Sequence, residues 1–109
     1  MSGGITFSPE KVWIVATWAY RYTTDFIRNH VSEDSFPKLY SLVTEDENPL
    51  NFIFLDKLTV DERREFFSAV KLAYDDIIKE NGKTFVSREY YENYLILLKE
   101  LMEMIPDND

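Results

Sequence analysis

The segment from Thr59 to Gly82 constrains the fold more than any other part of the sequence. In the tetrapeptide 59–62, Thr59 can accept a hydrogen bond from the backbone of Glu62, while the Glu62 side chain bonds back to the amide of Thr59. The segment closes at Asn81 and Gly82, because glycine readily adopts the left-handed conformation that ends a helix. Apolar residues recur between these ends at helical spacing. We therefore predict a long helix here.

A second long helix is expected near the N-terminus. Ser8 is a suitable N-cap and Pro9 suits the first helical position, since a missing amide proton is harmless there. The apolar pattern then runs to about Val31. The sequence therefore predicts a helix from Ser8 to about Val31.

The rest of the chain adds a short helix and another long one. The short helix starts near Pro37. The long one begins after Ser87 and ends just before Pro106, which cannot continue a helix. The apolar segment 50–58 is too short for its periodicity to distinguish a helical turn from an extended piece, so both alternatives stay open.

Length and composition fit a single domain. The chain has 109 residues, of which 45% are hydrophobic, and it can bury about two-thirds of the surface that its unfolded form exposes. We expect residues 1–109 to form one all-α domain, a compact bundle of three long helices and one or two short ones. Residues 1–6 and 107–109 are expected to be frayed. The absence of cysteine excludes a disulfide framework and a thiolate metal site.

The charge balance narrows the class of partner. Twenty Asp and Glu residues against twelve Lys and Arg residues leave a net charge of −8, which argues against direct binding to nucleic acid or to an anionic membrane. It suits a basic protein partner, and equally a protein that is acidic for solubility. The longest nearly uncharged stretch, residues 12–20, is about half of what spans a bilayer. We therefore expect a soluble cytoplasmic protein.

Two of the predicted helices carry apolar residues on their polar sides. On the last helix, Ile96 falls opposite the core stripe, and on the helix after Thr59, Leu72 holds a similar position. Single exposed aliphatic residues are ordinary, yet an apolar side chain within a charged rim is also the usual build of a protein-binding hot spot. The surrounding candidate partner-binding acids are Glu92, Glu100 and Glu103 near Ile96, and Glu65, Asp75 and Asp76 near Leu72.

The predicted N-terminal helix has two more such residues, Ile14 and Trp18. We favour the interpretation that the apolar segment 50–58 covers both, because that segment has no other obvious surface to pack on. The alternative is that they face solvent, which makes Trp18 a further candidate for partner binding.

No motif for catalysis or cofactor binding is found. His30 is the only histidine and falls on the core-facing side of its helix, so neither a triad nor a helical metal site can be completed. An acidic loop lacks the alternating ligands and central glycine of a calcium loop, and is interpreted first as solvated and second as partner-binding. Its acids are Glu45, Asp46 and Glu47. We expect no enzymatic activity, no cofactor and no metal.

The chain resembles the small acidic immunity proteins with which bacteria neutralise toxin domains of contact-dependent and polymorphic toxin systems. The similarity lies in a short acidic helical chain without a catalytic motif, and in the helix opening at residues 58–66, LTVDERREF. It covers about the C-terminal half. The resemblance implies an inhibitor that binds a basic toxin nuclease and blocks its active site or substrate groove with carboxylates. It implies no particular site residues.

Two other functions stay open. A phage or plasmid inhibitor that imitates nucleic-acid charge would lose its partner to competing DNA. A non-catalytic helical subunit would self-assemble, for example as a homodimer, through Ile96 and Leu72, and the change Ile96→Glu would dissolve that dimer. An enzyme ranks last.

Overall fold

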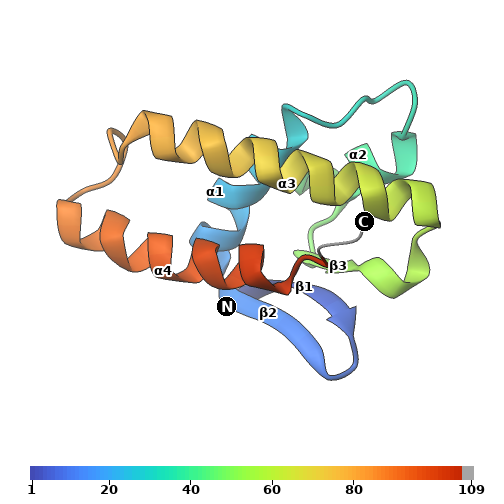
Figure 1. Cartoon of the computed structure of the whole chain (residues 1–109), viewed down its shortest axis with the longest axis horizontal. Coiled ribbons are helices and arrows are strands. Elements are labelled where there is room, and N and C mark those ends of the chain that lie inside the picture. The colour runs from blue at the N-terminus through green and yellow to red at the C-terminus, as the bar shows by residue number, and fades with distance from the viewer. Residues whose placement is uncertain (107–109) are drawn as a thin grey trace.

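The computed structural model describes residues 1–106, and within them a three-stranded sheet is combined with four α-helices (Figure 1). The elements are β1 (Ser2–Ser8), β2 (Lys11–Ala16), α1 (Thr17–Arg28), α2 (Pro37–Leu42), η1 (Glu45–Glu47), β3 (Phe52–Phe54), η2 (Leu55–Lys57), α3 (Val60–Glu80) and α4 (Arg88–Met104). The fold is therefore mixed α/β, and the prediction of an all-α helical bundle is wrong. The prediction that residues 107–109 are frayed lies outside the described residues.

An antiparallel hairpin replaces the first turns of the predicted N-terminal helix. Ser8 on β1 lies opposite Lys11 on β2, so Pro9 and Glu10 form the turn between the strands. Pro9 suits such a turn for the same reason that it suits a helix start, because its ring holds φ near the value that both require. The helix itself begins only at Thr17.

Residues that we expected to be frayed lie in the middle of the sheet. The strand order is β2-β1-β3, so β1 pairs with an antiparallel strand on one side and a parallel strand on the other. Gly3, Gly4 and Ile5 are buried, and the ring of Tyr20 lies only 2.6 Å from where a Cβ of Gly3 would stand. The prediction of a frayed segment 1–6 is therefore wrong for this strand.

The segment 50–58 is extended first and then turns. Phe52 on β3 lies opposite Gly4 on β1, and η2 follows the strand directly. Ile53 and Leu55 are buried, at 0% and 1% exposure. The segment therefore contributes to the core through a strand that pairs with β1.

The ends of the two long C-terminal helices agree with the prediction. The Glu62 amide donates to Thr59 Oγ1 at 3.1 Å, and the Thr59 amide donates to Glu62 Oε1 at 2.8 Å, which completes the capping box of α3. Asn81 and Gly82 close α3 with positive φ values of 56° and 75°. Ser87 caps α4 by accepting a hydrogen bond from an amide of its first turn.

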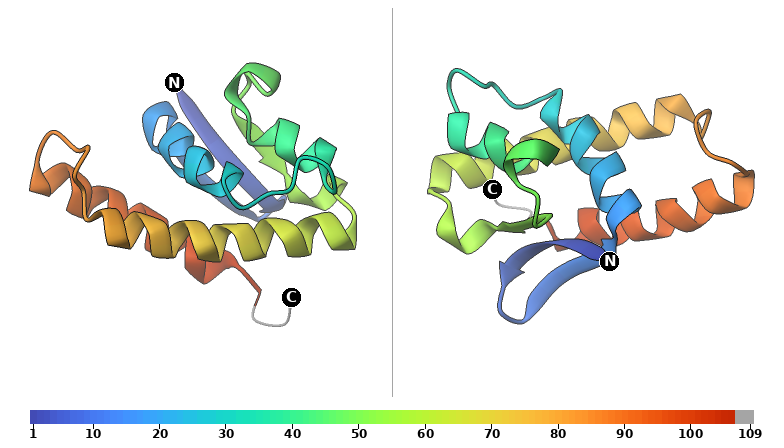
Figure 2. Two further views of the ribbon diagram at one scale, coloured as in Figure 1. Left: turned by 90° about the horizontal axis from the view of Figure 1, so that it is seen from above. Right: turned by 180° about the vertical axis from the view of Figure 1, so that it is seen from behind.

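The elements form two layers, as Figure 2 shows. One layer consists of α3 and α4, which run antiparallel. The other contains the sheet, α1 and α2, all packed against the same face of the helix pair. Completely or almost completely buried side chains from both layers fill the space between them. They include Ile5, Trp13, Ile27, Ile53, Phe66, Ile77, Tyr94, Leu98 and Leu101.

Candidate functional site

Ile96 lies on the exposed side of α4, opposite its buried stripe. Its side chain is 59% exposed, and Glu92, Glu100 and Glu103 on the same side are exposed as well. Of these, Glu92 lies 3.7 Å from the guanidinium of Arg88, one turn earlier on the helix. The prediction that Ile96 faces outward among carboxylates is confirmed.

Leu72 also faces outward, at 46% exposure, but its surroundings differ. His30 Nε2 lies 2.6 Å from the Asp76 carboxylate and joins the segment after α1 to α3. Glu65 is half-buried, whereas Asp75 is exposed. The side of α3 that carries Leu72 and Asp76 therefore adjoins the end of α1. Of the acids near Leu72, Asp76 holds the two segments together through its contact with His30.

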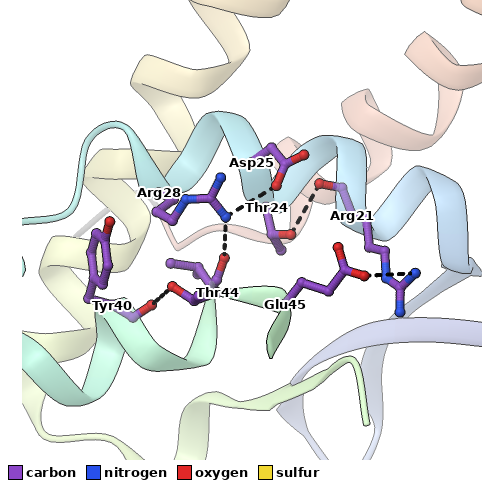
Figure 3. A network of polar contacts seen from close by, with 8 residues as sticks. Arg21, Thr24, Asp25, Arg28, Tyr40, Thr44 and Glu45 are labelled. Atoms are coloured by element: carbon purple, nitrogen blue, oxygen red, sulfur yellow. Dashed lines mark hydrogen bonds and ion pairs between the residues drawn. The ribbon is translucent and has the colours of Figure 1, made fainter. Parts of the chain in front are cut away.

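The acidic loop forms η1, and two of its three carboxylates make contacts with other parts of the chain. Glu45 makes an ion pair with Arg21 of α1 at 3.1 Å, and Glu47 accepts a 3.4 Å hydrogen bond from a serine hydroxyl of α2. Arg28, two turns after Arg21 on α1, donates to the backbone carbonyl of Val43, the C-cap residue of α2 (Figure 3). Asp46 is exposed. This network ties η1 and α2 to α1, so η1 has a structural role whether or not it meets a partner.

Trp18 and Ile14 are not covered by the segment 50–58, and that interpretation is wrong. Ile14 is 60% exposed and Trp18 is 50% exposed. Ile14 lies on the outer face of the sheet, because side chains alternate along β2 and Trp13 and Val15 take the inner positions.

Trp18 lies at the edge of an open hollow of about 310 Å³, which we call the aromatic groove. The groove lies between the start of α1 and the loop that joins α3 to α4. Its lining residues are Trp18, Tyr22, Thr84, Phe85, Val86 and Tyr90.

Edge-to-face contacts between rings build the groove. Trp18 and Tyr22 lie one turn apart on α1, and both make T-shaped contacts with Phe85, with centroid distances of 6.0 Å and 5.0 Å. Tyr94, which is 1% exposed, lies beneath Phe85 at 5.6 Å. Aromatic pairs in such geometry contribute about 0.5–1.5 kcal/mol each beyond the area they bury. Contacts among aromatic rings therefore stabilise the base of the groove.

The polar groups at the base of the groove are paired. The Tyr22 hydroxyl and the Thr84 hydroxyl both donate to Glu80 Oε1, at 3.2 Å and 2.9 Å. Burial, followed by the negative charge of Glu80, raises the pKa of Tyr22 to about 12. Tyr22 therefore stays neutral at physiological pH, and the groove offers an apolar surface rather than a reactive group.

Tyr90 connects the aromatic groove with the exposed side of α4. Its ring is 57% exposed and lines both the groove and a second hollow of about 300 Å³ that it shares with Glu89 and Asn93. Ile96 follows Asn93 by three positions on the same side of the helix. We call the exposed side of α4 the acidic face. Its residues are Glu89, Glu92, Asn93, Ile96, Lys99, Glu100 and Glu103, so four carboxylates stand against one cation.

Trp18 and the acids around Ile96 could be predicted from the sequence, whereas nothing in the sequence indicated that Phe85 and Val86 lie beside Trp18. Val86 lies just before the N-cap of α4 and is 93% exposed in the structure. Nothing in the local pattern places it beside α1, because the contact joins segments more than sixty positions apart.

No protein-family model, curated protein or solved structure matches this chain. Among residues 1–106, no group of three or more His, Cys, Asp or Glu side chains is arranged to hold a metal ion. In the same part of the chain, every helix is too short or too polar to cross a membrane.

Proposed function

We propose that this protein binds a basic region of another protein through the acidic face of α4. The observation that carries the proposal is Ile96, an aliphatic side chain that is 59% exposed in the middle of a row of exposed carboxylates. Burying such a side chain contributes on the order of 1.5–3 kcal/mol. The carboxylates around it favour a cationic partner and accelerate its approach.

Within this class we favour a cytoplasmic inhibitor of the immunity type whose target is a basic toxin nuclease domain. A nuclease holds its polyanionic substrate with Lys and Arg side chains. Carboxylates in a row along α4 compete for the same cations, and the net charge of −8 supports this sign of partner. No catalytic step belongs to the proposal, and the sole histidine, His30, is bonded to Asp76.

The test uses the full chain as bait in an extract of its native host. We expect the wild type to retain a basic protein and Ile96→Lys to weaken that interaction by about 10- to 100-fold, since the anchor is lost. Val60→Lys is the matched control, because Val60 is an aliphatic residue of similar exposure, 52%, at the far end of α3. The same substitution at Leu72 measures whether α3 takes part.

The folded state of each variant is checked by circular dichroism and by the midpoint of urea unfolding. Undiminished retention by a folded Ile96→Lys variant would contradict the proposal, as would a retained partner that is acidic. Loss of the partner to added duplex DNA would support a target site that binds nucleic acid, which a nuclease inhibitor and a nucleic-acid mimic both require. A wild-type dimer in sedimentation that Ile96→Glu dissolves would favour self-assembly instead.

A further inference from the structure

We propose that the aromatic groove receives one bulky aromatic side chain of the same basic partner, at one end of a segment that lies along the acidic face. This inference rests on the proposed function, because it assigns the groove to the partner that α4 recognises. It names the chemistry of that partner: an extended peptide segment with an aromatic residue followed by Lys or Arg residues.

The groove has the size of a single side chain. Its volume of about 310 Å³ is at the lower limit of pockets that hold small-molecule ligands, about 300–1,000 Å³. The hydroxyls of Tyr22 and Thr84 already donate to Glu80. A polar ligand would therefore find few free groups to bind, whereas an aromatic ring would add edge-to-face contacts to those already present.

The rim of the groove exposes large apolar side chains to water. Val86, Tyr90 and Trp18 are 93%, 57% and 50% exposed. Tyrosine and tryptophan are the residue types most enriched in binding hot spots. Covering all three at once is favourable, because each is an apolar surface that folding has left in water.

The groove is held in shape before binding. The Phe85 amide donates to the Gly82 carbonyl at 3.1 Å, and Arg88 donates to the Asn81 carbonyl and to its side-chain oxygen at 3.1 Å and 3.0 Å. Trp18 rests against Phe85. Little ordering of the loop is then needed when a partner binds, which lowers the entropic cost.

The acidic face next to the groove favours cationic residues in the part of the segment that follows the inserted ring. Glu89 lines the hollow beside Tyr90, so a cationic residue that follows the inserted ring meets a carboxylate. From Tyr90 to Glu103 the helix rises by about 20 Å, the reach of about six extended residues. A second copy of this chain is a poor occupant, because it would bring a net charge of −8 against another.

The test is an NMR titration of the ¹⁵N-labelled full chain with three capped hexapeptides: one tryptophan followed by five lysines, one alanine followed by five lysines, and one tryptophan followed by five glutamates. We expect the Trp-Lys peptide to bind about tenfold more tightly than the Ala-Lys peptide. Its resonance shifts should include Trp18, Phe85 and Tyr90 as well as the acidic face. The Trp-Glu peptide should bind far more weakly.

A variant pair locates the ring. Tyr90→Ala should remove the preference for tryptophan over alanine, whereas Phe54→Ala should retain it, because Phe54 is an aromatic of similar exposure, 45%, on β3. Equal binding of the Trp-Lys and Ala-Lys peptides, or shifts confined to the outer face of the sheet, would overturn the inference.

The peptides also separate the two proposals. Lysine-dependent binding that Ile96→Lys abolishes, without any preference for tryptophan, would leave the proposed function standing and remove the groove from it. Equal binding of the Trp-Lys and Trp-Glu peptides would contradict the basic partner, and with it both the proposed function and this inference.

Discussion

The indole N–H of Trp13 donates a hydrogen bond to the backbone carbonyl of Leu97 at 2.8 Å, across 84 positions of the sequence. Trp13 is 2% exposed, so the bond joins β2 to α4 in the interior of the protein. The N-terminal hairpin thereby supports the helix that carries the acidic face. The stability of the proposed binding surface therefore depends on the first sixteen residues as well as on α4 itself.

The change Trp13→Phe tests this support. It removes the hydrogen bond to Leu97 and leaves a space where the larger ring was, so the free energy of unfolding should fall by about 1–3 kcal/mol. Urea unfolding measures the change. Trp18→Phe is the matched control, since Trp18 is 50% exposed and phenylalanine keeps an aromatic ring beside Phe85, and it should lower the free energy of unfolding by less than Trp13→Phe does. Equal effects would contradict the assigned role of Trp13.

Gly82 is a position where only glycine fits. Its φ is +75°, and a Cβ there would lie 2.6 Å from Cγ of the Tyr91 ring. Gly82→Ala should therefore lower the free energy of unfolding by about 2 kcal/mol or more, through backbone strain and displacement of the ring. Lys83→Ala, at the next exposed position, should change it by less than about 0.5 kcal/mol. The thermal midpoints of the two variants provide the comparison.

Asp75 and Asp76 are adjacent acids with different surroundings. Asp76 pairs with His30 at 2.6 Å, whereas Asp75 is exposed. Asp76→Ala should lower the free energy of unfolding by about 1 kcal/mol, and Asp75→Ala should leave it nearly unchanged. Urea unfolding of both variants at neutral pH measures the difference. A larger loss in Asp75→Ala would show that the pair with His30 does not stabilise α3 against α1.

Because Tyr20 and Tyr94 are buried, we expect the free energy of unfolding to fall at alkaline pH. Burial raises the pKa of Tyr20 and of Tyr94 far above 10.0, their ordinary value. Below about pH 10 both hydroxyls keep their protons in the folded and unfolded chains, so they add no pH dependence. Above it the unfolded chain releases protons that the folded chain retains. The free energy of unfolding should then fall by about 1.4 kcal/mol per pH unit for each tyrosine, up to its raised pKa.

Tyr20→Phe isolates one of these contributions. Within the described residues the Tyr20 hydroxyl is buried without a hydrogen-bond partner, so its removal should cost little stability at neutral pH. Between about pH 10 and 12 the free energy of unfolding should fall less steeply with pH in the variant than in the wild type. The two slopes should differ by about 1.4 kcal/mol per pH unit, the contribution of one buried tyrosine. Urea unfolding at a series of pH values measures both slopes. Parallel slopes would show that Tyr20 titrates normally in the folded protein.

Local sequence alone determined the parts of this protein whose signals are local. The capping residues Thr59 and Glu62 form the expected box, and Ser87 begins α4 as predicted. The outward positions of Leu72 and Ile96 follow from their place on a helical wheel. Each of these features depends on residues within a turn or two of one another, so it can be predicted from the local sequence without knowledge of the rest of the fold.

Tertiary structure decided the sheet and the groove. Pro9 is compatible with a helix start or a hairpin turn, and the folded chain takes the hairpin, in which Ile5 and Trp13 lie opposite each other on β1 and β2 and are both buried. β3 then joins β1 in parallel, from more than forty positions away. The aromatic groove brings Trp18 to Phe85 in the same way. Such contacts gain their free energy from burial between distant segments, which no local pattern contains.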